Sequence, residues 1–217
     1  MNGNKQPKAM VYVVDDDVAV RRGIARLLRA SGRACLVFDS AKAYLSATLE
    51  PCEAACIVLD IRMPEMSGTE LQTLVRGTRR EEPIIFVTGH GDIPTCVRAL
   101  KAGAVSFLSK PFDADELLTA VSEALQRSAG QRRSREREAE AQTRFQRLSA
   151  REREVFDGVI RGDLNKVIAG NLGIAEKTVK IHRARVMEKM EADSVAELVR
   201  LGGRLERPAG SAAEGGA

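Results

Sequence analysis

The chain has no tryptophan, and aromatic residues make up only 4% of its 217 residues. Its cores must therefore consist mainly of aliphatic side chains. The sequence also lacks an apolar run long enough to cross a bilayer and an amino-terminal secretion signal. We therefore expect a cytoplasmic protein that does not bind membranes.

Cysteine and histidine are scarce, with four and two residues. The cysteines, Cys35, Cys52, Cys56 and Cys96, show no paired CxxC spacing of the kind that zinc sites use. A free cysteine is usually a small buried hydrophobic residue. These residues therefore indicate neither a zinc site nor a disulfide framework.

The length suits two small domains with separate cores, because single domains usually hold about 100 to 150 residues. The formal net charge is +4, and the positive excess lies entirely after residue 127. This asymmetry favours a polyanionic partner for the C-terminal part only.

Five short apolar runs alternate with helical patterns in the first part of the chain. Strands alternating with helices predict an α/β fold with a doubly wound, five-stranded parallel sheet of the flavodoxin type. We expect a loose tail over 1–8 and this domain over 9–127. The runs are MVYVVDD (10–16), ACLVF (34–38), ACIVLD (55–60), PIIFVT (83–88) and AVSFLSK (104–110).

Residues 128–147 are rich in charge and in good helix formers, which predicts a solvated helical linker. A coiled coil is the alternative, although no apolar a/d stripe continues through the segment. Residues 148–206 predict an all-α domain of four short helices, broken at Gly162, Gly173 and Asp193. The composition of 207–217 predicts a disordered tail.

Reactive side chains follow four of the predicted strands: Asp15 and Asp16, Asp60, Thr88, and Lys110. In a doubly wound sheet the ligand site lies at the carboxyl ends of the strands, so we expect these side chains to converge. A single acid after a strand often only caps the next helix. Capping does not account for the whole group, nor for Pro111, whose peptide bond with Lys110 could be cis.

Three carboxylates at one edge repel one another, so a cation must compensate them. Lys110 supplies one positive charge, and Mg²⁺ fits because it prefers carboxylate, water and phosphate oxygens. A carboxylate is a competent phosphoryl acceptor when the phosphoryl group is positioned and its charge is neutralised. Asp60 is the candidate acceptor.

The motifs VVDDD, VLDIRMPEMSG, VTGHGD and FLSKPF resemble the receiver domain of two-component response regulators along the whole first domain. The resemblance implies phosphorylation of Asp60 and a Mg²⁺ site formed by Asp16, Asp60 and the Arg62 backbone carbonyl, with Asp15 acting through water. It also implies that Thr88 and Lys110 contact the phosphoryl group and that Phe107 turns inward when Thr88 moves. Asp17 stands where receivers commonly have Glu, outside the implied metal ligands.

The second domain shows apolar residues at helical spacing in three successive segments, with Gly173-Ile174 as the turn between the last two. In the second segment these residues are Val167, Ile168 and Leu172. The third segment interleaves its apolar stripe with basic residues, which is typical of a helix that packs on one face and binds a polyanion with the other. A solvated basic helix is the alternative for the segment taken alone. The basic residues are Lys177, Lys180, Arg183, Arg185 and Lys189.

The segments LSAREREV, NKVIAGNLGIAEKTVKIH and SVAELVRL resemble the LuxR-type helix-turn-helix module, and the whole chain resembles regulators of the FixJ/NarL type. The resemblance implies phosphate contacts by Lys166 and Thr178, and base contacts by Lys180, Ile181 and Ala184. Lys177 and Arg183 complete the expected DNA-binding set. Ala175 replaces the usual Ser or Thr at the start of the third helix and removes its cap. Val195, Leu198 and Val199 form an expected dimer surface, part of which could instead close the core of the module.

These features predict a phosphorylation-controlled transcription regulator rather than an enzyme. A sensor histidine kinase would phosphorylate Asp60, and the protein would then form a homodimer and bind double-stranded DNA, with RNA polymerase as a further partner. One alternative is an aspartyl-phosphate phosphatase with Asp60 or Asp15 as nucleophile, but no segment resembles the substrate cap that it needs. Another is a DNA-binding protein whose receiver has lost its role.

Overall fold

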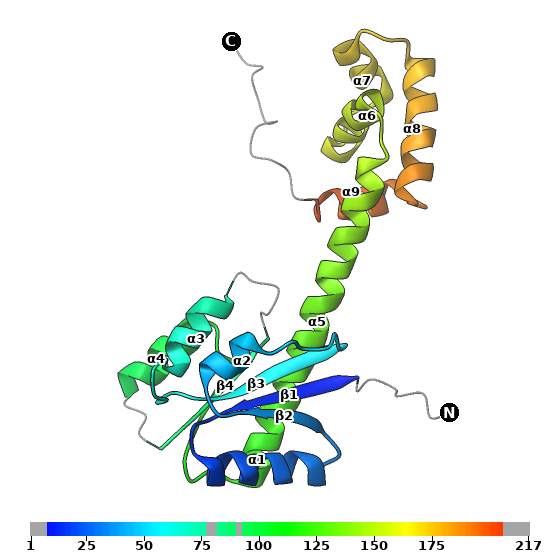
Figure 1. Cartoon of the computed structure of the whole chain (residues 1–217). Coiled ribbons are helices and arrows are strands. Elements are labelled where there is room, and N and C mark those ends of the chain that lie inside the picture. Colours follow the sequence, from blue (N-terminus) through cyan, green and yellow to red (C-terminus); the bar gives the residue numbers. More distant parts are fainter. Residues whose placement is uncertain (1–7, 77–81, 90–92, 206–217) are drawn as a thin grey trace, which may run out of the picture. The chain divides into compact units, whose positions relative to one another are not determined.

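The computed structural model describes residues 8–76, 82–89 and 93–205 (Figure 1). The chain divides into two compact units, Met1–Arg132 and Arg133–Ala217. The division falls inside helix α5 (Ala114–Gln146), within the segment expected to be a linker. The expected tails lie almost entirely outside the described residues.

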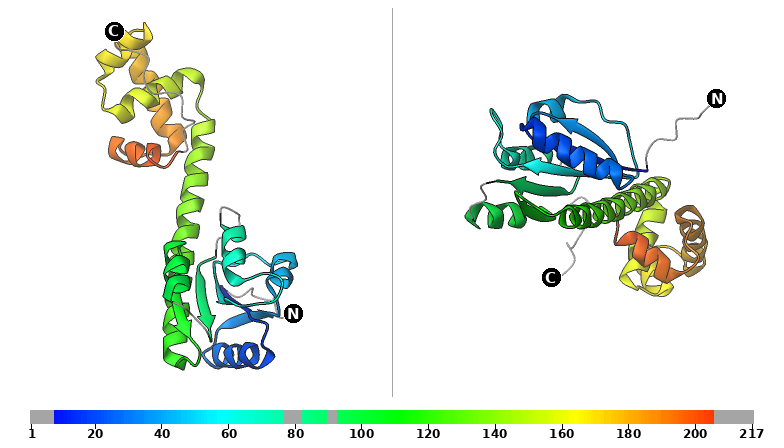
Figure 2. Two further views of the ribbon diagram at one scale, coloured as in Figure 1. Left: turned by 90° about the vertical axis from the view of Figure 1, so that its left-hand side faces the viewer. Right: turned by 90° about the horizontal axis from the view of Figure 1, so that it is seen from below.

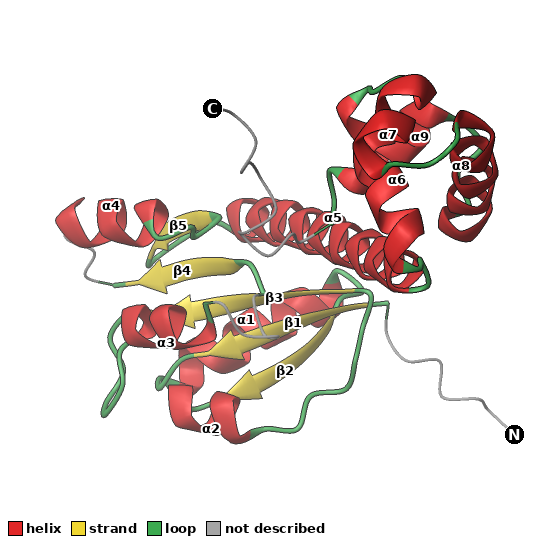
Figure 3. Ribbon diagram, turned by 90° about the horizontal axis from the view of Figure 1, so that it is seen from above, coloured by secondary structure: helices red, strands yellow, loops and turns green. Residues whose placement is uncertain are grey.

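The first unit is built on a parallel sheet with the strand order β2-β1-β3-β4-β5, which confirms the predicted doubly wound fold (Figure 3). The order reverses between β1 and β3, which places the switch point beside their carboxyl ends. The strands are β1 (Ala9–Val14), β2 (Ala34–Phe38), β3 (Ala54–Asp60), β4 (Ile84–Thr88) and β5 (Ser106–Ser109).

Helices cover both faces of this sheet, because strand side chains alternate between the faces and are apolar on both. Helix α1 (Val18–Ala30) and the first part of α5 pack on one face, where Leu28 and Leu117 are fully buried (Figure 2). Helices α2 (Ala41–Ser46), α3 (Gly68–Val75) and α4 (Ile93–Lys101) contribute to the core on the other face.

The second unit contains α6 (Ala150–Arg161), α7 (Asn165–Leu172), α8 (Glu176–Met190) and α9 (Val195–Gly202). The breaks predicted at Gly162 and Gly173 are confirmed, because both residues end a helix in the left-handed conformation that glycine adopts without strain. Phe156, Ile168, Val186 and Leu198 are among the buried side chains of its core.

The end of α5 belongs to the core of the second unit. Ala141 is fully buried, and the Phe145 ring lies 5.2 Å from the Phe156 ring, centroid to centroid. Arg144 forms an ion pair of 2.9 Å with Glu191. The expectation of a solvated linker therefore does not hold at this end of the segment. Ala141 and Phe145 anchor the helix to the second core, although most of the surrounding residues are charged.

The helices of both units differ in whether a side chain caps their first turn. Side-chain oxygens cap α1, α2, α3, α6 and α9. Helix α8 begins after Ala175 without a side-chain cap, which confirms the prediction, and α7 likewise begins after Leu164 without one. A missing cap typically costs about 1 kcal/mol of stability.

Candidate functional site

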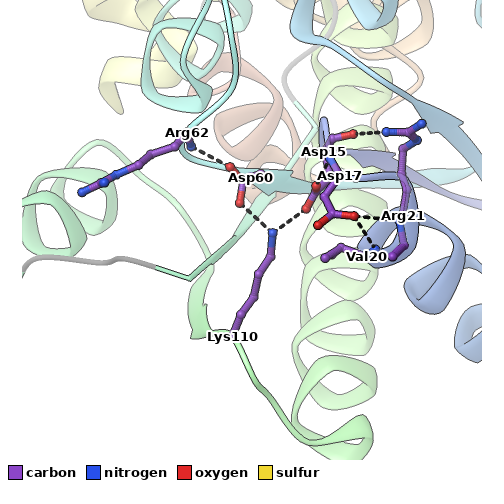
Figure 4. Close-up of polar contacts among 8 residues, drawn as sticks. Asp15, Asp17, Val20, Arg21, Asp60, Arg62 and Lys110 are labelled. Atoms are coloured by element: carbon purple, nitrogen blue, oxygen red, sulfur yellow. Dashed lines mark hydrogen bonds and ion pairs between the residues drawn. The ribbon is translucent and has the colours of Figure 1, made fainter.

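Two acidic side chains and one basic side chain meet at the carboxyl ends of the strands (Figure 4). The Lys110 Nζ lies 2.6 Å from Asp15 Oδ2 and 2.8 Å from Asp60 Oδ1. Asp15 follows β1, Asp60 ends β3 and Lys110 follows β5, so the parallel sheet brings together residues far apart in the chain. Both carboxylates are buried, and the single ammonium group of Lys110 offsets one of their two negative charges.

Backbone and side-chain donors fix the orientation of both carboxylates. The Arg62 backbone N–H donates to Asp60 Oδ2 at 2.6 Å, and the Asp17 N–H donates to Asp15 Oδ1 at 2.8 Å. The Arg21 guanidinium donates to the Asp15 carbonyl at 2.6 Å (Figure 4). These roles of Arg21 and Arg62 could not be read from the sequence, because they depend on loop and helix geometry rather than on a motif.

Burial and the neighbouring charges shift the pKa values of Asp60 and Lys110. Desolvation raises the pKa of Asp60, and the neighbouring Asp15 adds to the rise, while Lys110 and the Arg62 N–H oppose it. Burial works to lower the pKa of Lys110, but its hydrogen bonds to Asp15 and Asp60 outweigh burial and raise it. The Lys110 side chain is therefore held as an ammonium group between the carboxylates.

The other residues expected at this edge take different positions. Asp16 is exposed, whereas Thr88 is buried at the end of β4 and its carbonyl accepts a 2.8 Å hydrogen bond from the Lys110 backbone. Phe107 is half-buried and packs on the core beside α2, α3 and α4. The Lys110–Pro111 bond is cis. Asp17 caps α1 by accepting from the Ala19 and Val20 N–H groups, and these bonds lower its pKa.

The side chains fit a hard divalent cation in their chemistry, because Asp15, Asp16 and Asp60 offer only carboxylate oxygens. Within the described residues, no three acidic, histidine or cysteine side chains are already grouped as a metal site. Asp15 and Asp60 are instead paired with Lys110, whereas Asp16 is exposed and forms no ion pair within the described residues.

In the second unit, α8 presents an exposed basic surface after the α7–α8 turn. Lys177, Lys180, Ile181 and Ala184 are exposed on α8 and Lys166 is exposed on α7, while Thr178 is half-buried. Lys180 lies 3.5 Å from Glu176, one turn earlier on the same helix. Arg183 donates a 3.0 Å hydrogen bond to the Asn165 side chain, which ties α8 to the start of α7.

Comparisons with known proteins give the family of each unit. Residues 11–122 match the family "Response regulator receiver domain", and residues 146–201 match "Bacterial regulatory proteins, luxR family". The chain belongs to the two-component response regulators. It carries a receiver domain and a DNA-binding domain of the LuxR type.

Named relatives of this response regulator match it over most of their length. Nodulation protein W of Bradyrhizobium diazoefficiens is 46% identical over 194 residues, 89% of this chain and 85% of the relative. Transcriptional regulatory protein FixJ of Azorhizobium caulinodans is 46% identical over 191 residues, 88% and 90% of the two chains. The solved structure of response regulator StyR covers 91% of this chain and 99% of its own, with 47% identity and a TM-score of 0.78.

The expected dimer surface of the response regulator needs one correction. Leu198 is fully buried in the core of the second unit, so its side chain is not available to a partner. Val195 and Val199 remain 39% and 42% exposed on the same helix. The opposite holds for Val167, which the helical spacing placed in the apolar stripe: it is exposed, because Ile168 occupies the inward position on the short helix α7.

A buried ion pair that the sequence analysis missed ties α6 to α8. Glu152 is buried, accepts from the Ser149 N–H at 2.8 Å and lies 2.7 Å from Lys189 Nζ. The hydrogen bond from Lys189 is the main reason that the pKa of Glu152 is lowered to about 2. The capping motif Ser149-x-x-Glu152 is visible in the sequence, but the partner on α8 is not.

In the part of the chain that the structure describes, none of the helices combines the length and the apolar character needed to cross a bilayer.

Proposed function

We propose that this response regulator controls transcription after a sensor histidine kinase phosphorylates Asp60. The observation that carries the proposal is the Lys110 ammonium group shared by Asp15 and Asp60 at the carboxyl ends of the sheet. Positioning and charge neutralisation are the main requirements of phosphoryl transfer, and a lysine held beside the acceptor carboxylate supports both.

In the proposed step, an Asp60 carboxylate oxygen attacks the phosphorus of a phosphohistidine. The O–P bond forms, the P–N bond breaks, and the leaving imidazole nitrogen keeps the bonding electrons and takes up a proton. The Arg62 N–H holds one Asp60 oxygen while Lys110 contacts the other. Lys110 would then form an ion pair with a phosphoryl oxygen, because the new negative charge lies on the phosphoryl group.

Mg²⁺ is the proposed cofactor, held by Asp16, Asp60 and the Arg62 backbone carbonyl, with Asp15 acting through water. When bound, it would neutralise charge on the phosphoryl oxygens. The exposure of Asp16 supports this role, because its carboxylate has no ion pair to break within the described residues. Lys110 offsets only one of the two negative charges of Asp15 and Asp60, so the cation would compensate the charge that remains.

Phosphorylation would reach the rest of the chain through Thr88 and Phe107. Thr88 lies at the end of β4, and its carbonyl already accepts a hydrogen bond from the Lys110 backbone. Phe107 is half-buried on the neighbouring strand, paired in register with Phe86. A shift of Thr88 toward the phosphoryl group would leave room for Phe107 to turn inward and alter the surface that forms a homodimer.

The homodimer would bring two copies of α8 to successive major grooves, about 34 Å apart. We assign phosphate contacts to Lys166, Lys177 and Thr178, and base contacts to Lys180, Ile181 and Ala184. Arg183 is bonded to Asn165, and we assign it a positioning role beside its DNA contact. Because Ala184 cannot hydrogen-bond a base, Lys180 would carry most of the directional recognition. RNA polymerase is the proposed partner of the DNA-bound dimer.

The decisive experiment selects binding sites from random duplexes with and without a phosphodonor and Mg²⁺. Asp60→Asn should remove phosphorylation and the gain in DNA affinity together, whereas the matched control Asp115→Asn should retain both. Asp60→Asn protein that binds DNA as well as phosphodonor-treated wild type would contradict the proposal. So would sustained turnover of a phosphomonoester, which would indicate a phosphatase.

The assignment of Lys180 has a separate test. Lys180→Ala should weaken binding and relax the base preference at one position, as measured by binding titrations against substituted duplexes. The corresponding control, Lys166→Ala, should weaken binding to all duplexes alike and reduce the salt slope by about 0.9. A base preference unchanged by Lys180→Ala would remove Lys180 from the reading surface.

A further inference from the structure

Strand β2 forms an open edge of the sheet in the first unit (Figure 3). Among the described strands it pairs only with β1, so the hydrogen-bonding groups on its outer side have no strand partner there. Leu36 and Val37 are 44% and 43% exposed on this edge. Proteins usually protect an edge strand from pairing with other chains, so two successive exposed apolar residues require an explanation.

The two exposed residues point to opposite faces of the sheet, because side chains alternate along a strand. Phe38 packs with the core beside α2, so Leu36, two residues earlier, shares that face. Val37 instead lines a groove of about 410 Å³ between β2 and α1. A chain added to this edge would therefore contact Leu36 on one face and the α1 groove on the other.

The α1 side of this groove is strongly basic. Arg22, Arg26 and Arg29 line it and are all exposed, and α1 contains no acidic residue. None of the three forms an ion pair with any other residue in the described ranges 8–76, 82–89 and 93–205. Three uncompensated positive charges beside an open strand edge thus favour an occupant of negative charge.

The charge also decides against a second copy of this chain as the occupant. Two β2 edges that paired directly would each carry a row of arginines on the α1 side of the joined sheet. Like charges brought together at a partly desolvated interface repel each other and weaken the association. The arginines therefore protect the edge from self-association while leaving it open to an acidic partner.

We propose that the β2 edge, together with Arg22, Arg26 and Arg29, binds an extended acidic segment of another protein as a sixth strand of the sheet. The inference goes beyond the proposed function and does not depend on Asp60 or α8. Main-chain hydrogen bonds would give affinity, and side-chain positions would give specificity. The partner should alternate acidic residues, which face the arginines, with apolar residues, which face Leu36.

The probe for this site is a fluorescein-labelled peptide of five Glu-Val repeats, titrated with the full-length protein and followed by anisotropy. A peptide with five Glu followed by five Val has the same composition and charge but the wrong pattern. A third peptide, N-methylated at every residue, keeps the side chains but loses its backbone donors. We expect saturable binding of the alternating peptide and at least tenfold weaker binding of the other two.

Two charge-removing variants identify the site. Arg22→Gln/Arg29→Gln should weaken binding of the alternating peptide at least tenfold, whereas the control Arg133→Gln/Arg137→Gln, on the exposed surface of α5, should change it less than twofold. Circular dichroism should show that both variants retain the helix content of the wild type.

Several results would overturn the proposal. The alternating peptide could fail to show saturable binding, all three peptides could bind equally, or the two variants could have equal effects. Concentration-dependent dimers that Leu36→Lys abolishes would show instead that a second copy of the chain occupies the edge. Duplex DNA or phosphatidylserine vesicles that bind through Arg22 and Arg29 in preference to the peptide would assign the surface to another class of partner and also refute it.

Discussion

Replacement of Lys110 by alanine tests the electrostatic account of the site most directly. The Lys110 side chain is 20% exposed and contacts two buried carboxylates at 2.6 and 2.8 Å. Removing one partner of a buried ion pair typically costs 3 to 5 kcal/mol, because it leaves uncompensated buried charge. We expect Lys110→Ala to lower the free energy of unfolding by about 3 kcal/mol at pH 7. This value is the lower end of that range, because Lys110 is partly exposed.

The loss should depend on pH with a defined sign. Without Lys110, the pKa of Asp60 rises further above its ordinary value of 3.8, because desolvation and Asp15 are then less opposed. An acid whose pKa is higher in the folded state destabilises that state as pH rises from the unfolded pKa through the folded one. The deficit of Lys110→Ala should therefore be small near pH 4 and largest at neutral pH.

The assay can follow the first unit alone, because the chain has no tryptophan and its tyrosines, Tyr12 and Tyr44, are both buried there. Urea unfolding is followed by tyrosine fluorescence between pH 4.5 and 7.5. In an Asp60→Asn background, Lys110→Ala should cost about half as much, since one of the two carboxylates is gone. A loss below about 1 kcal/mol at pH 7, or one that grows toward acid pH, would refute the reasoning.

Three further predictions concern the second unit. Glu152→Gln should lower the free energy of unfolding of the second unit by about 1 to 2 kcal/mol at pH 7, measured by hydrogen exchange of α6 in the intact chain. Because the pKa of Glu152 in the folded state is about 2, the stabilisation by Glu152 is present above about pH 4.5 and is lost as the pH falls toward 2. A fragment of residues 133–217 should be more stable to urea than one of 148–217 by about 2 to 4 kcal/mol, because the shorter fragment lacks the buried end of α5; equal midpoints would exclude a role for that end. Gly158→Ala should destabilise by about 1 to 3 kcal/mol in thermal unfolding, because its Cβ would lie 2.7 Å from the Ile168 side chain, and an unchanged melting temperature would contradict this close packing.

The sequence was most informative where a pattern is local. Buried parallel strands appear as short apolar runs, and their ends at Asp60 and Thr88 were predicted to the residue. The helix breaks at Gly162 and Gly173 were equally clear, because each needs a positive φ that glycine adopts at little cost.

Residues whose position depends on distant packing were harder to predict. Leu198 and Val199 look alike in the sequence, yet only Leu198 faces the core of its unit. Likewise, the charged composition of the linker segment concealed the contribution of Ala141 and Phe145 to the second core. Helical periodicity gives a face, but the partner helices decide how much of that face is covered.

By itself, the sequence determined the two-domain architecture, the order of strands and helices along the chain, and the set of acidic and basic residues at the strand ends. Only the tertiary structure decided that Asp15, rather than Asp16, shares Lys110 with Asp60, and that Glu152 meets Lys189. The physical reason is that backbone conformation and apolar patterning are local properties of the chain. Ion pairs between residues far apart in the sequence depend on distances that only the packed sheet and helices set.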